Sequence, residues 1–127
     1  MKEKNTVFYK CPICDNLIGL IQGDSDKINC CGQKMKRLVA NQDENKTKKH
    51  IPTYEKVEDE IFVRVGEDTH PMEKDHYIEW IAQVSDNQTT RIRLYPEQNP
   101  EVRFKYIPGA IIYAYCTKDG LWKTEVK

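Results

Sequence analysis

The chain has 127 residues, of which 39% are hydrophobic and 31% charged, and its 20 basic and 20 acidic side chains give a formal net charge of +0 at pH 7. This length suits one domain, or one ordinary domain with an appendage too small to bury a core of its own. The balanced charge excludes a bulk attraction to nucleic acid or to an anionic membrane surface, so we expect a small partner.

The N-terminal run MKEKNTVFYK contains no apolar segment of the kind that signal peptides carry. No stretch of the sequence approaches the roughly 18 apolar residues of a membrane span. We therefore expect a cytoplasmic protein without a membrane-spanning segment. In that reducing compartment, the five cysteines indicate metal or redox chemistry rather than structural disulfides.

Most of the cysteines lie close together near the N-terminus, in the runs CPIC and CC: Cys11, Cys14, Cys30 and Cys31. Four thiolates suffice for a tetrahedral site, and the C-x2-C spacing suits zinc and iron equally. The adjacent pair cannot form a second C-x2-C knuckle, which favours a distorted iron site, and a disulfide within the pair would be strained. The sequence thus predicts a small domain over residues 1–37 whose folding depends on metal.

Residues 41–49, NQDENKTKK, are polar and aperiodic, and they read as a linker or mobile loop. The runs that follow alternate apolar and polar residues, as in EIFVRVG, where Ile61, Val63 and Val65 share one face. Gly and Pro residues and the pair Asp119–Gly120 mark turns between these runs. About six or seven short strands in residues 38–127, with no convincing helix, predict an antiparallel β-sandwich in a mainly β chain.

All three histidines, and the fifth cysteine, fall within this β segment: His50, His70, His76 and Cys116. A lone histidine near a charged loop is usually a solvated side chain. However, His70 lies just before Pro71, His76 is expected to open a strand, and Cys116 ends the apolar run AIIYAYC. Three imidazoles and a thiolate at one end of a sandwich would suit a redox-active transition metal.

The sequence resembles the desulfoferrodoxins, iron superoxide reductases with an N-terminal desulforedoxin-like domain. The resemblance covers nearly the whole chain, and it is carried by CPIC and CC, KHIP, HPMEKDHYIEWI, and YC followed by GLW. It implies a desulforedoxin-like four-thiolate iron domain over residues 1–37 and an immunoglobulin-like sandwich over residues 38–127. It also implies a second iron, held in the sandwich by His50, His70, His76 and Cys116, with Lys49 beside an open coordination position.

The implied activity is the one-electron reduction of superoxide to hydrogen peroxide at the second iron, in defence against oxidative stress. An external electron donor such as a rubredoxin-like protein would return that iron to the ferrous state. The resemblance further implies a homodimer, and zinc is a plausible substitute for iron in either site.

Two positions depart from the family. Asp119 stands where the resemblance expects a fourth histidine, and Lys48 stands where the family usually has glutamate. Asp119 is either a further metal ligand, which would lower the reduction potential, or only a residue of an Asp-Gly hairpin turn. If it takes a positive φ in that turn, histidine would be strained there. An alternative function follows, that of a degenerate family member acting as an electron-transfer or metal-binding protein.

Overall fold

The computed structural model describes residues 6–23, 27–66 and 70–127. The chain divides into two compact units, residues 1–39 and residues 40–127. Its strands pair antiparallel in both units, and the fold is mainly β, as the sequence predicts. None of the helices in the described ranges has the length and apolar character needed to cross a bilayer.

The first unit is a small sheet with strand order β2-β1-β5, together with the hairpin β3-β4. Its strands are β1 (Val7–Lys10), β2 (Leu17–Leu20), β3 (Asn29–Cys30), β4 (Gln33–Lys34) and β5 (Lys36–Arg37). One buried cluster of this unit consists of Tyr9, Met35 and a cysteine, Cys11. Because this buried cluster is small, a metal ion held by the cysteines would add much to the stability of the cysteine-bearing loops.

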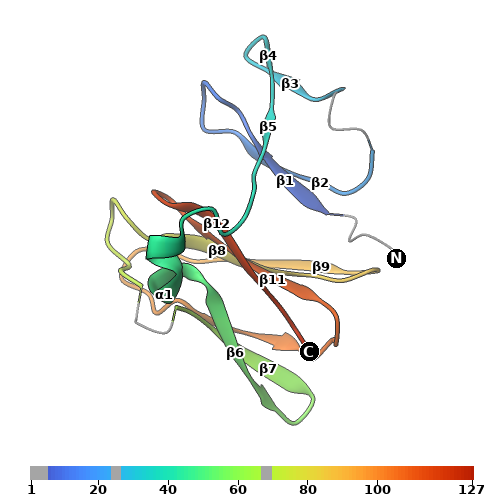
Figure 1. Ribbon diagram of the computed structural model, residues 1–127, viewed down its shortest axis with the longest axis vertical. Coiled ribbons are helices and arrows are strands. Elements are labelled where there is room, and N and C mark those ends of the chain that lie inside the picture. The colour runs from blue at the N-terminus through green and yellow to red at the C-terminus, as the bar shows by residue number, and fades with distance from the viewer. Residues whose placement is uncertain (1–5, 24–26, 67–69) are drawn as a thin grey trace. The chain divides into compact units, whose positions relative to one another are not determined.

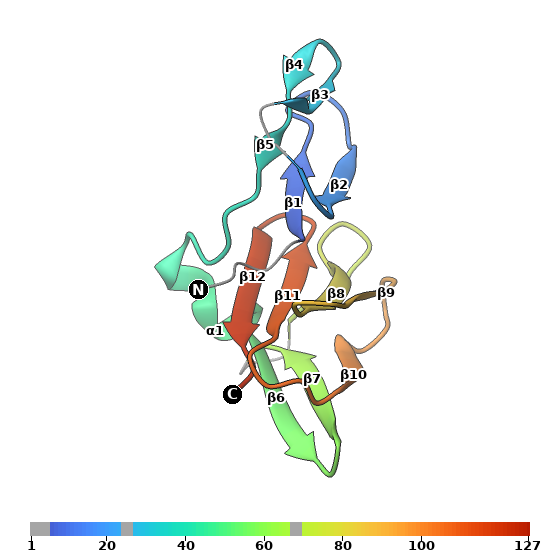
Figure 2. The ribbon, with the colours of Figure 1, turned by 90° about the vertical axis from the view of Figure 1, so that its right-hand side faces the viewer.

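The second unit packs two sheets, with strand orders β10-β7-β6 and β12-β11-β8-β9 (Figures 1 and 2). The strands are β6 (Pro52–Val57), β7 (Glu60–Val65), β8 (Ile78–Val84), β9 (Thr89–Arg93), β10 (Glu101–Lys105), β11 (Ile111–Cys116) and β12 (Gly120–Glu125). The structure therefore confirms the predicted antiparallel sandwich.

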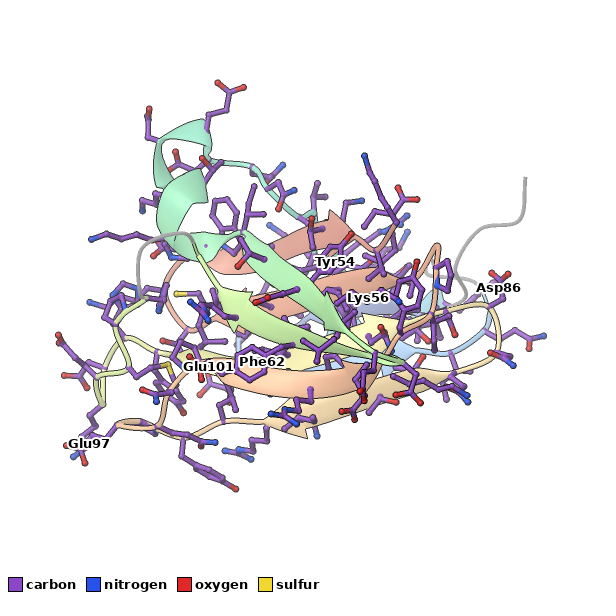
Figure 3. All side chains as sticks on the ribbon, turned by 90° about the horizontal axis from the view of Figure 1, so that it is seen from below. Tyr54, Lys56, Phe62, Asp86, Glu97 and Glu101 are labelled. Atoms are coloured by element: carbon purple, nitrogen blue, oxygen red, sulfur yellow. The ribbon has the colours of Figure 1, made fainter. Side chains whose placement is uncertain are left out.

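The predicted alternation along the strands sets the core of the sandwich. Ile61, Val63 and Val65 of β7 have no exposed surface, and they pack in one cluster with Ile112 and Ala114 of β11. Figure 3 shows the side chains on the sheet β10-β7-β6, in which Tyr54 lies on β6, Phe62 on β7 and Glu101 on β10. Burying branched aliphatic side chains on both inner faces supplies most of the stabilisation of such a sandwich.

The polar segment before β6 is not the irregular linker that its composition suggests. It forms a short 3-10 helix, η2 (Glu44–Lys46), followed directly by a single turn of helix, α1 (Thr47–His50). The Asp43 side chain caps η2 by accepting a hydrogen bond from the backbone N–H of Asn45 at 3.0 Å. The sequence lacks a helical period because one turn buries too little surface to need one.

Asn41 fastens the start of this segment to β12. Its backbone N–H donates to the carbonyl of Leu121 at 3.1 Å, and its side-chain amide exchanges two hydrogen bonds with the backbone of Lys123, at 3.2 and 2.9 Å. Asn41 has a φ of 60°, a conformation that asparagine tolerates better than most residues. The segment that leads to His50 is thereby held beside the hairpin that carries Asp119.

Two local expectations need correction. His76 does not open a strand, because β8 begins at Ile78 and His76 lies in an isolated bridge with Glu73. In the β11–β12 hairpin, where Cys116 pairs with Gly120, the positive φ of 82° belongs to Gly120. Asp119 is not among the described non-glycine residues with positive φ, so the turn itself does not disfavour another side chain there.

Candidate metal centres

The side chains predicted to bind metal gather into two groups, in each of which the ligating atoms lie within 4.8 Å of one another. The first group is Cys11, Cys14, Cys30 and Cys31, and the second is His50, His70, His76, Cys116 and Asp119. Each group has the size and donor chemistry of a site for one metal ion. That these residues bind metal remains a prediction.

The turn after β1 presents Cys11 and Cys14 to the first site. The backbone N–H groups of Ile13 and Cys14 both donate to the sulfur of Cys11 at 3.4 Å. The Cys14 N–H is the largest of the effects that lower the pKa of Cys11 to about 6. Hydrogen bonds to a sulfur favour its thiolate, which is the form that binds metal.

The second half of the first site is the adjacent pair. Cys30 ends β3, and Cys31 follows in a turn with a φ of 53°. Their sulfurs are 3.9 Å apart, far beyond the roughly 2.05 Å of a disulfide, and all five cysteines of the chain are free. Cys14 lies 3.6 Å from Cys30, sulfur to sulfur, so both halves face one point.

The four sulfurs cannot all ionise without a cation. Hydrogen bonding to the neighbouring thiols, first that of Cys14 and then those of Cys11 and Cys30, raises the pKa of Cys31 to about 12. Four converging thiolates would repel one another, whereas a bound cation would displace the remaining protons. This group therefore fits a metal ion.

Changing Cys30 to serine should remove the thiolate-to-iron colour of the first site and loosen the first unit, since one of its four sulfurs is lost. Metal binding at the second site should remain largely intact, because the two sites share no ligand. Absorption spectra and metal analysis of both sites check this. If both signals disappear together, the division into two independent sites is wrong.

The second site lies where three parts of the sandwich unit meet. His50 ends α1, His70 and His76 flank the loop before β8, and Cys116 ends β11. His50, His70 and Cys116 are buried, and Asp119, from the β11–β12 hairpin, has a side chain only 12% exposed. Residues distant in the sequence thus supply donors to one largely enclosed point.

Backbone carbonyls orient two of the imidazoles. Nδ1 of His50 lies 2.8 Å from the carbonyl oxygen of Lys46, and Nδ1 of His70 lies 2.6 Å from that of Pro71. A carbonyl only accepts, so each Nδ1 carries the proton and donates it. In the neutral imidazole, Nε2 then keeps its lone pair, which is the arrangement of a histidine that binds metal.

The two freed nitrogens point at each other. Nε2 of His50 and Nε2 of His70 are 3.0 Å apart. Burial lowers the pKa of His70 to about 4, so near neutral pH this imidazole carries no extra proton to bridge the gap. When His50 is also neutral, two lone pairs face each other at this separation and repel, and a cation held by both relieves the repulsion. This pair of atoms is the specific observation that fits a metal ion at the second site.

Asp119 adds an oxygen to the same point. Its Oδ2 lies 3.0 Å from Nε2 of His50, 3.1 Å from Nε2 of His76 and 3.7 Å from the sulfur of Cys116. Burial by itself would raise the pKa of Asp119, but the hydrogen bond from the Lys46 ammonium is the largest of the effects that lower it to about 2. The carboxylate is therefore ionised and faces the imidazoles, which a residue serving only as a turn would not require.

Cys116 is fully buried, and burial raises the pKa of its thiol. The backbone N–H of Asp119 donates to its sulfur at 3.4 Å, which partly offsets this effect. The thiol consequently keeps its proton near neutral pH until a cation displaces it.

Trp122 contacts two residues of the second site. It was not predicted as a site residue. Its ring stacks on the imidazole of His50, with centroids 4.9 Å apart, and its indole N–H donates to the backbone carbonyl of Asp119 at 3.1 Å. The only sequence signal was its place in GLW, the run that carried the resemblance. Trp122 therefore fixes both the plane of one imidazole and the hairpin that bears the carboxylate.

Two lysines next to the site differ in what they contact. Lys49, the predicted catalytic residue, lies on α1 directly before His50, and its side chain is exposed. Lys46, at the end of η2, places its ammonium 2.7 Å from Oδ1 of Asp119. Both lysines are exposed, and the ammonium of Lys46 is paired with a carboxylate of the site.

Comparison with known proteins gives concordant results. The family model described as Desulfoferrodoxin matches residues 42–125. A desulfoferrodoxin of Syntrophotalea carbinolica is 38% identical over 126 residues, which cover 98% of this chain and 99% of the relative. A desulfoferrodoxin homolog of Archaeoglobus fulgidus is 34% identical over 117 residues, which cover 91% of this chain and 94% of the relative.

Solved structures share the fold. The superoxide reductase of Treponema pallidum superposes with a TM-score of 0.76 and covers 98% of this chain and 100% of its own, at 21% identity. A superoxide reductase of Giardia intestinalis, described as 1Fe-SOR, superposes with a TM-score of 0.54 and covers 61% of this chain and 95% of its own, at 24% identity. At such identities the likeness establishes the fold.

Proposed function

The chain belongs to the desulfoferrodoxin family, and from this membership and the converging donors we propose that it is a superoxide reductase acting in defence against oxidative stress. In the proposed reaction, superoxide takes up one electron and two protons and leaves as hydrogen peroxide. The proposed ligands of the reactive iron are His50, His70, His76, Cys116 and Asp119.

The observation that carries this proposal is the pair of imidazole nitrogens 3.0 Å apart, next to a buried thiol and an ionised carboxylate. Nitrogen and thiolate donors suit iron and also zinc, whereas all-oxygen sites suit magnesium or calcium. Iron bound there would supply a reversible one-electron change between its ferrous and ferric states, which zinc lacks.

The chain's own residues have separate tasks in this proposal. The carbonyls of Lys46 and Pro71 hold the tautomers of His50 and His70, so that the lone pairs stay available. The exposed ammonium of Lys49 attracts the superoxide anion and orders water that can donate protons. Burial of Cys116 excludes bulk water from the sulfur.

The first unit has its own place in the proposal. We assign residues 1–37 to a four-thiolate iron domain and residues 38–127 to the reductase domain. An external donor, such as a rubredoxin-like protein, provides the electron for each turnover. The free state of all five cysteines suits a reducing compartment, which supports a cytoplasmic location, and family membership supports a homodimer.

The proposal is tested by counting irons and products. The purified protein is reduced without oxygen, its iron per chain is measured, and a known quantity of superoxide is added by rapid mixing. A reductase forms one hydrogen peroxide for each superoxide consumed, whereas dismutation forms one for every two. One iron or one zinc per chain, with no reaction beyond spontaneous dismutation, would instead identify an electron-transfer or metal-binding protein that keeps only the four-thiolate centre.

Lys49→Ala should slow the capture of superoxide without loss of metal, because it removes an exposed cation beside His50. The wild-type rate should also fall with added salt, since charges near a surface are screened over about 10 Å at 0.1 M ionic strength. Stopped-flow rates at several salt concentrations measure both effects.

The matched control is Lys105→Ala. Lys105 is also exposed. In the sheet register it lies opposite Glu60, and Glu60 lies opposite Val57, the last residue of β6, whereas His50 lies just before the first residue of β6. It removes the same charge from the other end of the sandwich and should change the rate less. Equal rates for wild type and Lys49→Ala at every salt concentration would show that Lys49 is only a solvated side chain with no role in capturing superoxide.

A further inference from the structure

Lys46 contacts the second site through both its side chain and its backbone. Its ammonium donates to Oδ1 of Asp119 at 2.7 Å, and its carbonyl accepts from Nδ1 of His50 at 2.8 Å. The other carboxylate oxygen, Oδ2, faces the imidazoles of His50 and His76. One residue therefore sets the direction of two neighbouring donors.

Exposed ion pairs usually contribute little free energy, so the burial of the two side chains decides how strongly Lys46 and Asp119 interact. The Asp119 side chain is 12% exposed, whereas that of Lys46 is 48% exposed, so the lysine covers a carboxylate that is itself largely withdrawn from water.

Hydrogen bonds of the segment before Lys46 hold it in this position. Asn41 ties the chain to β12, and Asp43 caps η2, which ends at Lys46. Asp43 also lies 3.9 Å from the Lys46 ammonium, a weaker second partner. Lys46 is thus held at the hairpin that carries Asp119 by several contacts, and the ion pair is one part of that arrangement.

The charges of the site give the pair a specific consequence. Ferrous iron with neutral imidazoles, one thiolate and one carboxylate would have a net charge of zero, and a ferric ion would be favoured by the two anionic donors. The Lys46 ammonium restores one positive charge at the outer oxygen of the carboxylate. It thereby opposes the preference for ferric iron and leaves a net attraction for an anion.

We propose that Lys46 is a positioning residue that directs Oδ2 of Asp119 toward the metal and neutralises Oδ1, so that the carboxylate serves the second site without lowering its reduction potential by its full charge. This inference rests on the proposed function for the presence of iron at that site. It assigns to Lys46 a role different from that of Lys49, which attracts the substrate.

The test measures the reduction potential of the second iron in the full-length protein, by anaerobic titration followed at the thiolate-to-iron absorption. Lys46→Met removes the ammonium and keeps much of the side-chain length. We expect it to favour ferric over ferrous iron at least tenfold more than wild type, a fall of about 59 mV for a one-electron couple. Lys46→Arg, which keeps the charge and the donor, should recover most of this shift.

Two controls separate a specific pair from a general loss of charge. Lys118→Met removes an exposed lysine adjacent in sequence to Asp119 and should shift the ferric preference less than threefold. In an Asp119→Asn background, Lys46→Met should lose most of its effect, because the partner carboxylate is gone. Loss of the second iron in Lys46→Met but not in Lys46→Arg would also support positioning.

An unchanged potential in Lys46→Met, or the same shift with and without the Asp119 carboxylate, would overturn the inference. The proposed function is judged separately, by the yield of hydrogen peroxide from superoxide with wild-type protein. A wild-type protein that shows the Lys46-dependent potential but does not react with superoxide would retain the positioning role and lose the reductase assignment. A wild-type protein without iron at the second site would refute both.

Discussion

Cys116→Ala should abolish the thiolate-to-iron absorption of the second site and weaken its metal affinity by more than roughly 100-fold. Loss of a residue that only hydrogen-bonds to a ligand costs up to about 100-fold, and loss of the ligand itself should cost more. The alanine fits the buried end of β11 without inserting a polar group, so the sandwich should remain folded. Anaerobic metal titration with absorption spectroscopy measures the loss. The four-thiolate centre serves as an internal control, because it contains none of the same ligands.

The same variant tests the protonation of the site. Burial raises the pKa of Cys116, so near neutral pH its thiol must release a proton when metal binds. His70 and Asp119, whose pKa values are about 4 and about 2, have no such proton to release. Below the thiol pKa, this proton contributes about tenfold per pH unit to the rise of the wild-type affinity, and Cys116→Ala should remove that contribution. An unchanged slope, or unchanged colour, would exclude Cys116 as a ligand.

Asp119→His should raise both the iron occupancy and the reduction potential of the second site. A neutral imidazole replaces a carboxylate, and the Lys46 ammonium, now without its closer partner, adds positive charge that favours ferrous iron. We expect a rise on the order of 60 mV or more, which corresponds to a tenfold change in ferrous over ferric preference. Iron analysis and anaerobic redox titration measure the two effects.

The hairpin should accept this histidine. The positive φ belongs to Gly120, and the contacts that Asp119 makes to the Cys116 sulfur and to the Trp122 indole come from its backbone N–H and carbonyl. Asp119→Asn is the matched control, since it removes the charge without supplying an imidazole. It should raise the potential but not the occupancy. If the histidine variant binds no more iron and titrates at the same or a lower potential, Asp119 is only a turn residue.

The sequence by itself determined the parts that depend on local pattern. One short segment contains four cysteines, Cys11, Cys14, Cys30 and Cys31, so a metal bound by one of them is expected to be bound by the other three as well. Alternation around Ile61, Val63 and Val65 predicted a strand with one buried face, and all three have no exposed surface. In each case the neighbours in the sequence are also the neighbours that matter physically.

Only the tertiary structure decided how the second site is assembled. Its donors meet because β6 pairs with β7 in one sheet, β8 with β11 in the other, and the two sheets pack together, and no interval between histidines encodes that register. The imidazoles are oriented by backbone carbonyls, which every residue possesses, so the sequence does not mark them.

The same reason explains why Lys46 and Asp119 could not be assigned from the sequence. Their polar surroundings read as a linker and a turn, because a single helical turn and a hairpin loop bury too little apolar surface to impose a period. Their contact joins residues far apart in the chain and depends on Asn41 holding one segment against β12. The sequence determined which donors were available, and long-range packing decided which of them face one another.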